Sequence, residues 1–412
     1  MKVCVKRMSG TKKSYHKTSI GAPIFDKREI NAVLRCLKEG RLSQGKYVQR
    51  FEKEFAKYIG TKYAVACNSG SSANLLIASV LKELYGNGGL VIVPAATFAT
   101  TISPFLQTGF RVVCSDVSTN ANIDPDELEG TIEGLLRKSN KAPCFLLAVH
   151  SLGIPCDMGK LQKIAKKHRL LILEDCCESH GAEYQGKRVG SFGLMSSFSF
   201  FVAHNMTSGE GGIVVTNNKK CYDLLRSFRE FGRKIDPGRW AYSKHLGFYD
   251  ERHQFDRLGF NFRMTDYTAS FAIEQLKKLN AFNNYRRKIV GYYTKRLKKW
   301  GSHKSFFVLP EEVQGNYNTY YGYLIIIREN SPFTRKKLVQ YLENRGIETR
   351  PFFAGFLPYQ KAFEKKVATI GKCSGAKLLH KNSFFIGCHP GVSKKDAEYV
   401  CNILDEFLEN YA

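Results

Sequence analysis

Three short stretches of the 412-residue chain carry side chains that could bind an anion, hold a ring nitrogen or move a proton. The first is residues 68–73, NSGSSA, which follow an apolar run and open a helical pattern. A glycine permits close backbone approach, and the free amides of a helix start attract an anion. Gly70 and Ser71 are therefore candidate phosphate-binding residues, although a plain strand-to-helix turn with a serine cap has the same pattern.

An acidic pair, Glu174 and Asp175, ends the apolar run LLIL. Ligands of open α/β sheets bind at the carboxyl ends of the strands, so a carboxylate here is expected to face the cleft. A buried aspartate needs a partner, and a protonated ring nitrogen would be one. A helix cap or a structural ion pair would explain Asp175 equally well.

A histidine, His204, stands in a polar turn within residues 196–212, SSFSFFVAHNMTSGEGG. Its imidazole has an ordinary pKa of about 6.5 and can act as a general base near neutral pH. A single histidine in a turn is more often structural than catalytic. The order of the three stretches along the chain is therefore better evidence for a catalytic role than the histidine alone.

Short apolar runs alternate with helical patterns around these stretches. YAVAC, LVIVP, FRVVCSD, FLLAVH and LLILEDC are typical of buried parallel strands, and the segments between them of amphipathic helices. This alternation predicts an α/β fold with a mostly parallel sheet covered by helices on both faces. We expect a basic extension over residues 1–19, a large domain over 20–285 and a small α+β domain over 286–412, with a long helical stretch from 265 to about 300.

The composition narrows the class of protein. A hydrophobic content of 43% and a charged content of 24% are ordinary for a soluble globular protein. No run reaches the roughly 20 apolar residues that cross a bilayer, so we expect no membrane contact and a cytoplasmic location. The formal charge of +26 comes from Lys and Arg spread along the chain without a nucleic-acid-binding motif. We interpret it as solvated surface and expect no nucleic-acid partner.

The twelve cysteines are spaced irregularly and include no CxxC pair. Neither a disulfide framework nor a structural zinc site is expected from this pattern, and most of these side chains should be small buried hydrophobes. We therefore expect no metal ion.

The order of the motifs GSSAN, VPAATFAT, VHSLGIPCDM, EDCCESHGA, SFSFF…GEGG and GFNFRMTD resembles the DegT/DnrJ/EryC1/StrS family of PLP-dependent sugar aminotransferases and dehydratases. The resemblance runs from about residue 21 to the C-terminus. It implies the aspartate-aminotransferase-like (type I PLP) fold with a seven-stranded type of sheet.

The resemblance implies how a cofactor phosphate is held. Gly70 and Ser71 match the phosphate-cradling pair, and Ser199 matches the family's phosphate-binding serine. Asn261 in GFNFR matches a residue that reaches the phosphate from the neighbouring subunit. A homodimer with shared active sites is therefore implied.

The resemblance also places residues around the cofactor ring. Phe98 matches the aromatic residue that stacks on the pyridine face, a contact that suits a π-system. Asp175 matches the aspartate that pairs with the pyridine nitrogen. Glu178 stands where many aminotransferases carry a glutamine beside the ring hydroxyl.

His204 is the main departure from the aminotransferase pattern. Family aminotransferases carry, five residues after the phosphate-binding serine, a lysine that holds PLP covalently, and no lysine lies between Lys187 and Lys219 here. Histidine at this place resembles the 3-dehydratase branch, which includes GDP-4-keto-6-deoxy-mannose 3-dehydratase. EDCCES and ETRPFFAG also resemble that branch, although Phe356 replaces its asparagine.

The branch implies an enzyme that removes the 3-hydroxyl from a nucleotide-linked 4-keto-6-deoxyhexose. PMP/PLP is bound noncovalently, and glutamate is the amino donor that regenerates PMP. An iron–sulfur relative would need one cysteine near Cys177 and three in the following loop, but residues 234–258 contain none, so no cluster is expected. A nucleotide-sugar 4-aminotransferase and a catalytically silent paralogue that binds PLP or a nucleotide sugar remain alternatives.

Overall fold

The computed structural model describes residues 18–40, 42–86, 89–138, 145–235, 241–243, 247–249, 253–300 and 306–411. Of the predicted N-terminal extension, residues 1–17 lie outside this part of the chain. Thr18 and Ser19 belong to the folded body, because Thr18 forms a parallel bridge with Ile347 and the Ser19 hydroxyl lies 3.2 Å from Nε2 of His389.

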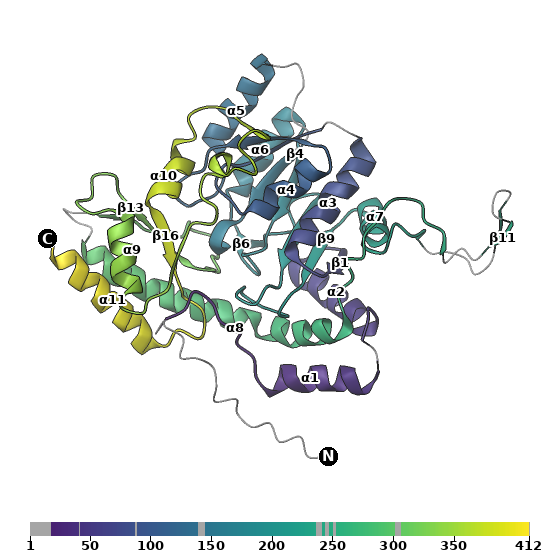
Figure 1. Ribbon diagram of the computed structural model, residues 1–412, viewed down its shortest axis with the longest axis horizontal. Helices are drawn as coiled ribbons and strands as arrows, with labels where there is room; N and C mark the ends of the chain where they lie inside the picture. Colours follow the sequence, from purple (N-terminus) through teal and green to yellow (C-terminus); the bar gives the residue numbers. More distant parts are fainter. Residues whose placement is uncertain are drawn as a thin grey trace.

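A large, mostly parallel sheet forms the centre of the molecule (Figure 1). The strand β9 runs antiparallel to both of its neighbours, and the other pairings within this sheet are parallel. The predicted α/β class is confirmed. In sheet order the strands are β1 (Tyr63–Cys67), β9 (Gly212–Thr216), β8 (Met195–Ser199), β5 (Leu171–Asp175), β4 (Phe145–Val149), β2 (Leu90–Pro94), β3 (Arg111–Ser115) and β15 (Val367–Thr369).

The sheet has one strand more than the seven expected. The eighth strand, β15, has three residues and pairs with β3 from far along the chain. A run of three residues carries no readable periodicity, so the pairing could be found only in the folded chain.

Both faces of the sheet are buried, which explains the nearly continuous apolar runs of its strands. Along β2, Val91 and Val93 belong to the core on the side of α3, α4 and α7, whereas Leu90 and Ile92 belong to the core on the side of α5 and α6. The helices are α1 (Lys27–Lys38), α2 (Lys46–Ile59), α3 (Gly70–Tyr85), α4 (Ala99–Gln107), α5 (Pro125–Lys138), α6 (Met158–His168) and α7 (Lys219–Arg229).

The long helix α8 (Asp266–Leu297) joins the two parts of the chain and confirms the predicted helical stretch. Its first half packs in the core formed by α2, β1 and β8, and its second half packs in the core of the small domain. The predicted domain boundary at residues 285 and 286 falls inside this continuous helix.

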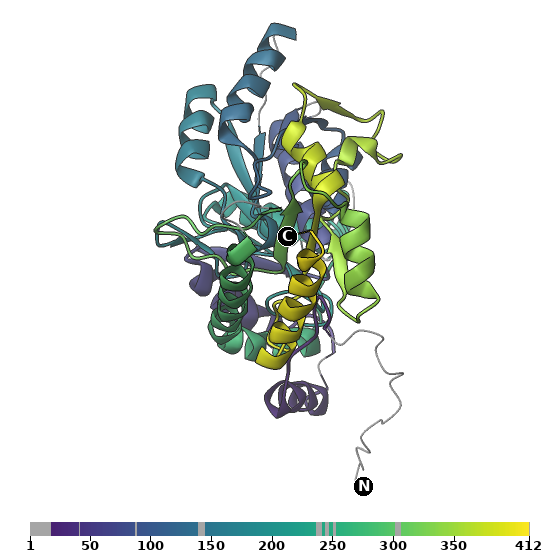
Figure 2. The same cartoon turned by 90° about the vertical axis from the view of Figure 1, so that its left-hand side faces the viewer.

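The C-terminal part forms a small α+β domain, shown toward the viewer in Figure 2. Its antiparallel sheet has the order β12 (Phe307–Val308), β13 (Tyr323–Ile327), β16 (Ser383–Ile386) and β14 (Thr349–Pro351). Its helices are α9 (Arg335–Glu343), α10 (Ser374–Asn382) and α11 (Lys394–Glu409).

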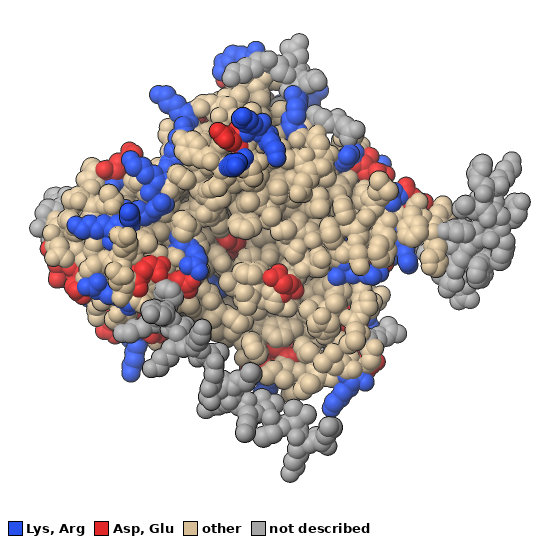
Figure 3. Space-filling model, viewed as in Figure 1, with Lys and Arg blue, Asp and Glu red and all other residues tan. Residues whose placement is uncertain are grey.

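Short elements complete the described chain. They are η1 (Ser151–Gly153), β6 (Glu183–Tyr184), β7 (Lys187–Arg188), β10 (Ala241–Ser243), β11 (Gly247–Tyr249), η3 (Lys298–Trp300) and η4 (Leu357–Tyr359). Among the described helices, none is both long enough and apolar enough to cross a membrane. Figure 3 shows Lys and Arg side chains scattered over several elements of one face and interleaved with Asp and Glu.

Candidate active site

A cavity of about 660 Å³ lies where the carboxyl ends of the central strands meet the small domain. Its walls come from the start of α3, the ends of β5 and β8, the loop before α4 and the segment around β14. Seven of the eight predicted site residues line it: Gly70, Ser71, Phe98, Asp175, Glu178, Ser199 and His204.

The loop before α3 packs tightly on β8 and β9. A Cβ added to Gly70 would lie 2.5 Å from the Cβ of Ser199, and one added to Gly212 would lie 2.2 Å from the Ser69 carbonyl oxygen. Only glycine fits at either position. The close approach places the first amides of α3 beside the hydroxyls of Ser71 and Ser199, a donor set that fits a phosphate.

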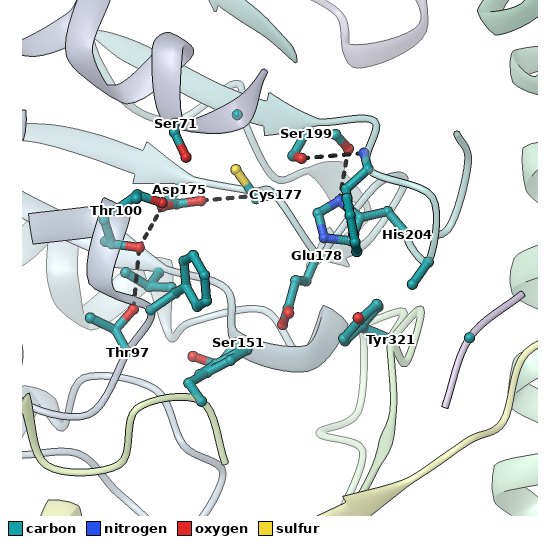
Figure 4. Close-up of a pocket in the computed structure, with 18 of the residues that line it drawn as sticks. Ser71, Thr97, Thr100, Ser151, Asp175, Cys177, Glu178, Ser199, His204 and Tyr321 are labelled. Atoms are coloured by element: carbon teal, nitrogen blue, oxygen red, sulfur yellow. Dashed lines mark hydrogen bonds between the residues drawn. The ribbon is translucent and has the colours of Figure 1, made fainter. Parts of the chain in front are cut away.

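Asp175 is buried and held by three donors (Figure 4). Its Oδ2 accepts hydrogen bonds from Nδ2 of Asn74 at 3.0 Å and Oγ1 of Thr101 at 2.9 Å, and its Oδ1 accepts one from the Cys177 amide at 3.1 Å. The carboxylate is thereby fixed at the cavity wall.

Sequence reasoning missed Asn74 and Thr101. Asn74 stands four residues after Gly70 in α3, so the two residues share one face of the helix. This spacing was a usable signal for Asn74. Thr101 sits in the first turn of α4 and carried no comparable signal.

His204 lies in the turn after β8, with its Nδ1 3.0 Å from the Ser199 carbonyl oxygen (Figure 4). A carbonyl oxygen only accepts, so Nδ1 carries the proton and Nε2 keeps its lone pair. Burial lowers the pKa of His204 to about 4, the Ser199 carbonyl opposes this shift, and the cationic Arg286 adds to it. The imidazole is therefore neutral and able to accept a proton near pH 7.

Aromatic rings surround the His204 imidazole. Tyr321 meets it edge to face, with ring centroids 5.3 Å apart, and Phe201 and His180 lie at 5.8 and 6.1 Å. These contacts restrict the orientation of the ring. Tyr321, at the entry to β13, was not among the predicted residues.

Glu178 is half-buried and lines the cavity. Its Oε2 accepts a hydrogen bond from the Leu152 amide at 3.0 Å. Burial raises the pKa of Glu178 well above its usual value, the Leu152 amide opposes this, and the charge of Asp175 adds to it. This shift favours the neutral acid form of the carboxyl group.

Phe98 precedes α4 and is 53% exposed, with its ring against the edge of Phe353 at a centroid distance of 6.5 Å. A large exposed ring at a cavity wall fits a flat ligand.

Phe356, which replaces the asparagine of the dehydratase pattern, does not line the cavity. It is buried, and its amide lies 3.3 Å from Nδ1 of His380.

Cations are scarce in the cavity. Among the described lining residues there is no lysine, and the one arginine, Arg350, forms an ion pair with Glu348. No described lining residue could therefore replace the missing lysine without a change in the fold.

Asn261 is the predicted residue that the structure does not bring to the cavity. It is exposed and forms a backbone bridge with Glu230 ahead of α8. Its role toward the phosphate of a neighbouring subunit stays a prediction.

One buried group has the composition of a metal site: His150, Glu174 and Cys176 place ligand atoms within 4.8 Å of one another. The Glu174 carboxylate, however, already accepts five hydrogen bonds. Its donors are His150, the hydroxyl of Ser196 and the amides of Gly190, Phe192 and Gly193. This saturation is typical of a structural carboxylate.

Residues 23–405 match the sequence profile of the DegT/DnrJ/EryC1/StrS aminotransferase family. The chain belongs to this family. It is 33% identical over 404 residues to the dTDP-4-dehydro-2,6-dideoxy-D-glucose 3-dehydratase of Saccharopolyspora spinosa, with 93% of this chain and 85% of that protein covered. It is 31% identical over 396 residues to the GDP-perosamine synthase of Caulobacter vibrioides, with coverages of 95% and 98%.

Solved structures agree with the family and the fold. The GDP-4-keto-6-deoxy-D-mannose-3-dehydratase of Escherichia coli, solved with bound hydrated PLP, superposes with a TM-score of 0.84 at 31% identity, covering 94% of this chain and 99% of that one. The PLP-dependent aminotransferase fold implied by the motifs is thus confirmed. The relatives bear the names of sugar dehydratases and of a perosamine synthase, so membership of the family does not by itself specify the reaction.

Proposed function

We propose that this chain is a PLP/PMP-dependent nucleotide-sugar 3-dehydratase that removes the 3-hydroxyl of a nucleotide-linked 4-keto-6-deoxyhexose, with glutamate as amino donor. One observation carries the proposal. His204 stands at the place of the family lysine with its Nε2 lone pair available, in a cavity whose described lining contains no lysine.

The residues present fit the cofactor. The first turn of α3 with Ser71 and Ser199 would hold the phosphate, Oδ1 of Asp175 would face the protonated ring nitrogen, and Phe98 would cover one ring face. Glycine at position 70 is what leaves room for the phosphate loop to lie on β8. When bound, the cofactor supplies a conjugated ring that accommodates an electron pair.

His204 supplies the base. Its Nδ1 donates to the Ser199 carbonyl, which fixes the tautomer and leaves Nε2 to accept a proton. The ring edge of Tyr321 limits rotation of the imidazole. Because an imidazole forms no Schiff base with an aldehyde, His204 would leave the cofactor bound by noncovalent contacts alone.

The decisive experiment is a product assay on the purified chain with PLP, glutamate and GDP-, dTDP-, UDP- or CDP-linked 4-keto-6-deoxy sugars. We expect one nucleotide series to yield a 3-deoxy-4-keto sugar, identified by mass. A product with a new 4-amino group and an intact 3-hydroxyl would instead make the chain an aminotransferase. Tight binding of PLP without any sugar product would indicate a silent paralogue.

Borohydride reduction tests the missing covalent link separately. Reduction of the PLP-loaded protein should label no cavity residue, because no described lysine lines the cavity. A PLP-labelled peptide from this cavity would contradict the proposed role of His204.

We also propose that the active site is completed by a second copy of the chain. The cofactor phosphate and the substrate diphosphate bring several negative charges, which proteins meet with Arg, Lys and amide donors. Among the described residues that line the cavity of one copy, Arg350 is the only Lys or Arg, and it forms an ion pair with Glu348. An exposed residue such as Asn261 is available to a neighbouring cavity.

A further inference from the structure

Two polar side chains and one aromatic ring lie together on the side of the cavity away from Ser71 and Asp175. They are Glu178, Ser151 and Tyr321 (Figure 4). Ser151 is 1% exposed and lines the cavity, yet its hydroxyl has no hydrogen-bond partner in the described part of the chain. A buried hydroxyl normally has a partner, so this one points to a polar group of a ligand.

The Glu178 carboxyl has one direct donor, the Leu152 amide, and no ion-pair partner among the described residues. The buried guanidinium of Arg286 contributes charge at a distance, but its Nη1 donates to the carbonyl oxygens of Tyr320 and Tyr321. A half-buried carboxyl with one donor and no counter-ion favours its protonated form. Glu178 can therefore donate a hydrogen bond, which a carboxylate cannot.

A continuous chain of hydrogen bonds fixes Glu178. Arg286 donates to the Tyr321 carbonyl at 2.9 Å, the Tyr321 amide donates to the Leu152 carbonyl at 2.8 Å, and the Leu152 amide donates to Glu178. These hydrogen bonds lead from α8 through the small domain to η1, so three separate segments of the polypeptide set the position of the Glu178 carboxyl.

The η1 turn is held in an unusual conformation. Leu152 has φ 51° and ψ 26°, a left-handed conformation that is rare for leucine. The next residue, Gly153, has φ 79°, and a Cβ there would lie 2.6 Å from the Tyr320 amide nitrogen. Backbone strain of this kind persists where the surrounding structure enforces it, and it concentrates at functional sites.

We propose that Ser151 and Glu178 form a hydroxyl-binding subsite for the substrate sugar, and that the Glu178 carboxyl donates the proton with which the 3-hydroxyl leaves as water. This inference rests on the proposed function. His204 accepts a proton and Glu178 gives one, so the two groups have opposite roles in one cavity. A neutral Glu178 that lies beside the ring hydroxyl of the cofactor could both bind a sugar hydroxyl and donate the proton.

The step balances without an added reagent. The C3–O bond breaks, its electron pair stays on the oxygen, and the oxygen takes the Glu178 proton to form water. The electron pair lost from C3 with the oxygen is replaced by the pair of the C–H bond whose proton Nε2 of His204 accepts. After release of the product, solvent returns one proton to Glu178 and takes one from His204.

Glu178→Gln is the main test, because glutamine still accepts from the Leu152 amide but has no acid proton. We expect single-turnover dehydration by the PMP form to fall about 10²- to 10⁴-fold, while conversion of PLP to PMP by glutamate changes only a few-fold. Ser151→Ala should raise KM for the sugar and leave the glutamate reaction unchanged. Glu210→Gln, an exposed carboxyl at the rim of the same cavity, is the matched control.

Infrared spectroscopy of the cofactor-free protein gives a readout that does not depend on turnover. The wild type at neutral pH should show the C=O stretch of a protonated carboxylic acid that disappears in Glu178→Gln and persists in Glu210→Gln. A spectrum unchanged by Glu178→Gln would overturn the acid role.

Equal losses in both half-reactions of Glu178→Gln would also overturn the proposal, because that result assigns Glu178 to cofactor positioning alone. Failure of the proposed function looks different. In that case the wild type forms no 3-deoxy sugar with any nucleotide series, and no variant comparison is needed.

Discussion

At the scale of single residues, the environment of a side chain matters more than its type. His204 and Glu178 face one cavity, and burial shifts the two pKa values in opposite directions. Burial favours the uncharged form of each group, which makes the imidazole a base and the carboxyl an acid at the same pH. Two groups with such opposed shifts are typical of acid–base pairs in enzymes.

The pH dependence of dehydration should report the lowered pKa of His204. With a pKa of about 4, Nε2 stays unprotonated from pH 8 down to about pH 5, and the rate falls only as the pH drops through 4. Single-turnover rates of the PMP form across this range give the measurement. An inflection near pH 6.5, the ordinary pKa of histidine, would contradict an imidazole that stays neutral down to pH 5.

The same shift links His204 to stability. The unfolded chain binds a proton at this histidine near pH 6.5, whereas the folded chain binds it only near pH 4, so stability falls as the pH drops between these values. The contribution amounts to about 3 kcal/mol at most. Urea unfolding at pH 7 and pH 5 should show a smaller loss for His204→Gln than for the wild type.

Thr101→Val should weaken cofactor binding through Asp175. Valine keeps the shape of threonine but removes the 2.9 Å hydrogen bond to Oδ2, which leaves a buried carboxylate with one donor fewer. A loss of this kind costs about 1–3 kcal/mol, which corresponds to a roughly 5- to 150-fold loss of PLP affinity. Spectroscopic titration with PLP measures it, and Thr131→Val, at a buried threonine that does not line the cavity, serves as control.

At the scale of elements, close packing of backbone on backbone builds the phosphate site. The loop before α3 touches β8 and β9 so closely that the chain needs glycine at positions 70 and 212. Packing on the Ser69 carbonyl thus explains the last glycine of the GEGG motif, Gly212. Two strands that follow α3 by more than a hundred residues decide where its first turn lies.

Gly212→Ala should displace the phosphate loop. The added Cβ would lie 2.2 Å from the Ser69 carbonyl oxygen, so the loop must move, and PLP affinity should fall at least 10-fold. Gly291→Ala in α8 is the control, since nothing lies within 4 Å of its added Cβ. That substitution should stabilise the protein by about 0.5–1 kcal/mol in urea unfolding. Unchanged PLP binding in Gly212→Ala would refute this account of the cradle.

At the scale of the whole molecule, the small domain is joined to the large one at several separate places. The strand β15 extends the large sheet, and Asp116 after β3 accepts hydrogen bonds from the amides of Gly375 and Ala376 at the start of α10. Thr18 bridges to Ile347 near β14. The cavity between the two domains is therefore built before any ligand enters.

Mixing two inactive variants tests the proposed sharing of active sites. If Asn261 serves the neighbouring cavity, a mixed dimer of His204→Gln and Asn261→Ala contains one intact site. Random mixing should then restore about a quarter of the wild-type activity. Absence of any recovery, with mixed dimers demonstrated by native mass spectrometry, would place Asn261 in its own subunit's site or outside any site.

The amino-acid sequence by itself determined the fold class, the family and seven of the residues that line the cavity. Motif order, apolar alternation and the histidine at the place of the lysine are properties of the linear chain, so they could be read without coordinates. Seven of the eight predicted site residues line one cavity for the same reason: each lies at the end of a strand, at the start of a helix or in the turn that follows a strand, at one edge of the sheet.

Only the tertiary structure decided what these side chains can do. The tautomer of His204 depends on the Ser199 carbonyl, the orientation of Asp175 on donors from α3 and α4, and the acid form of Glu178 on burial beside η1. The eighth strand likewise depends on a pairing between segments far apart in the chain. Hydrogen bonds and desolvation act through space, so residue order alone does not specify them.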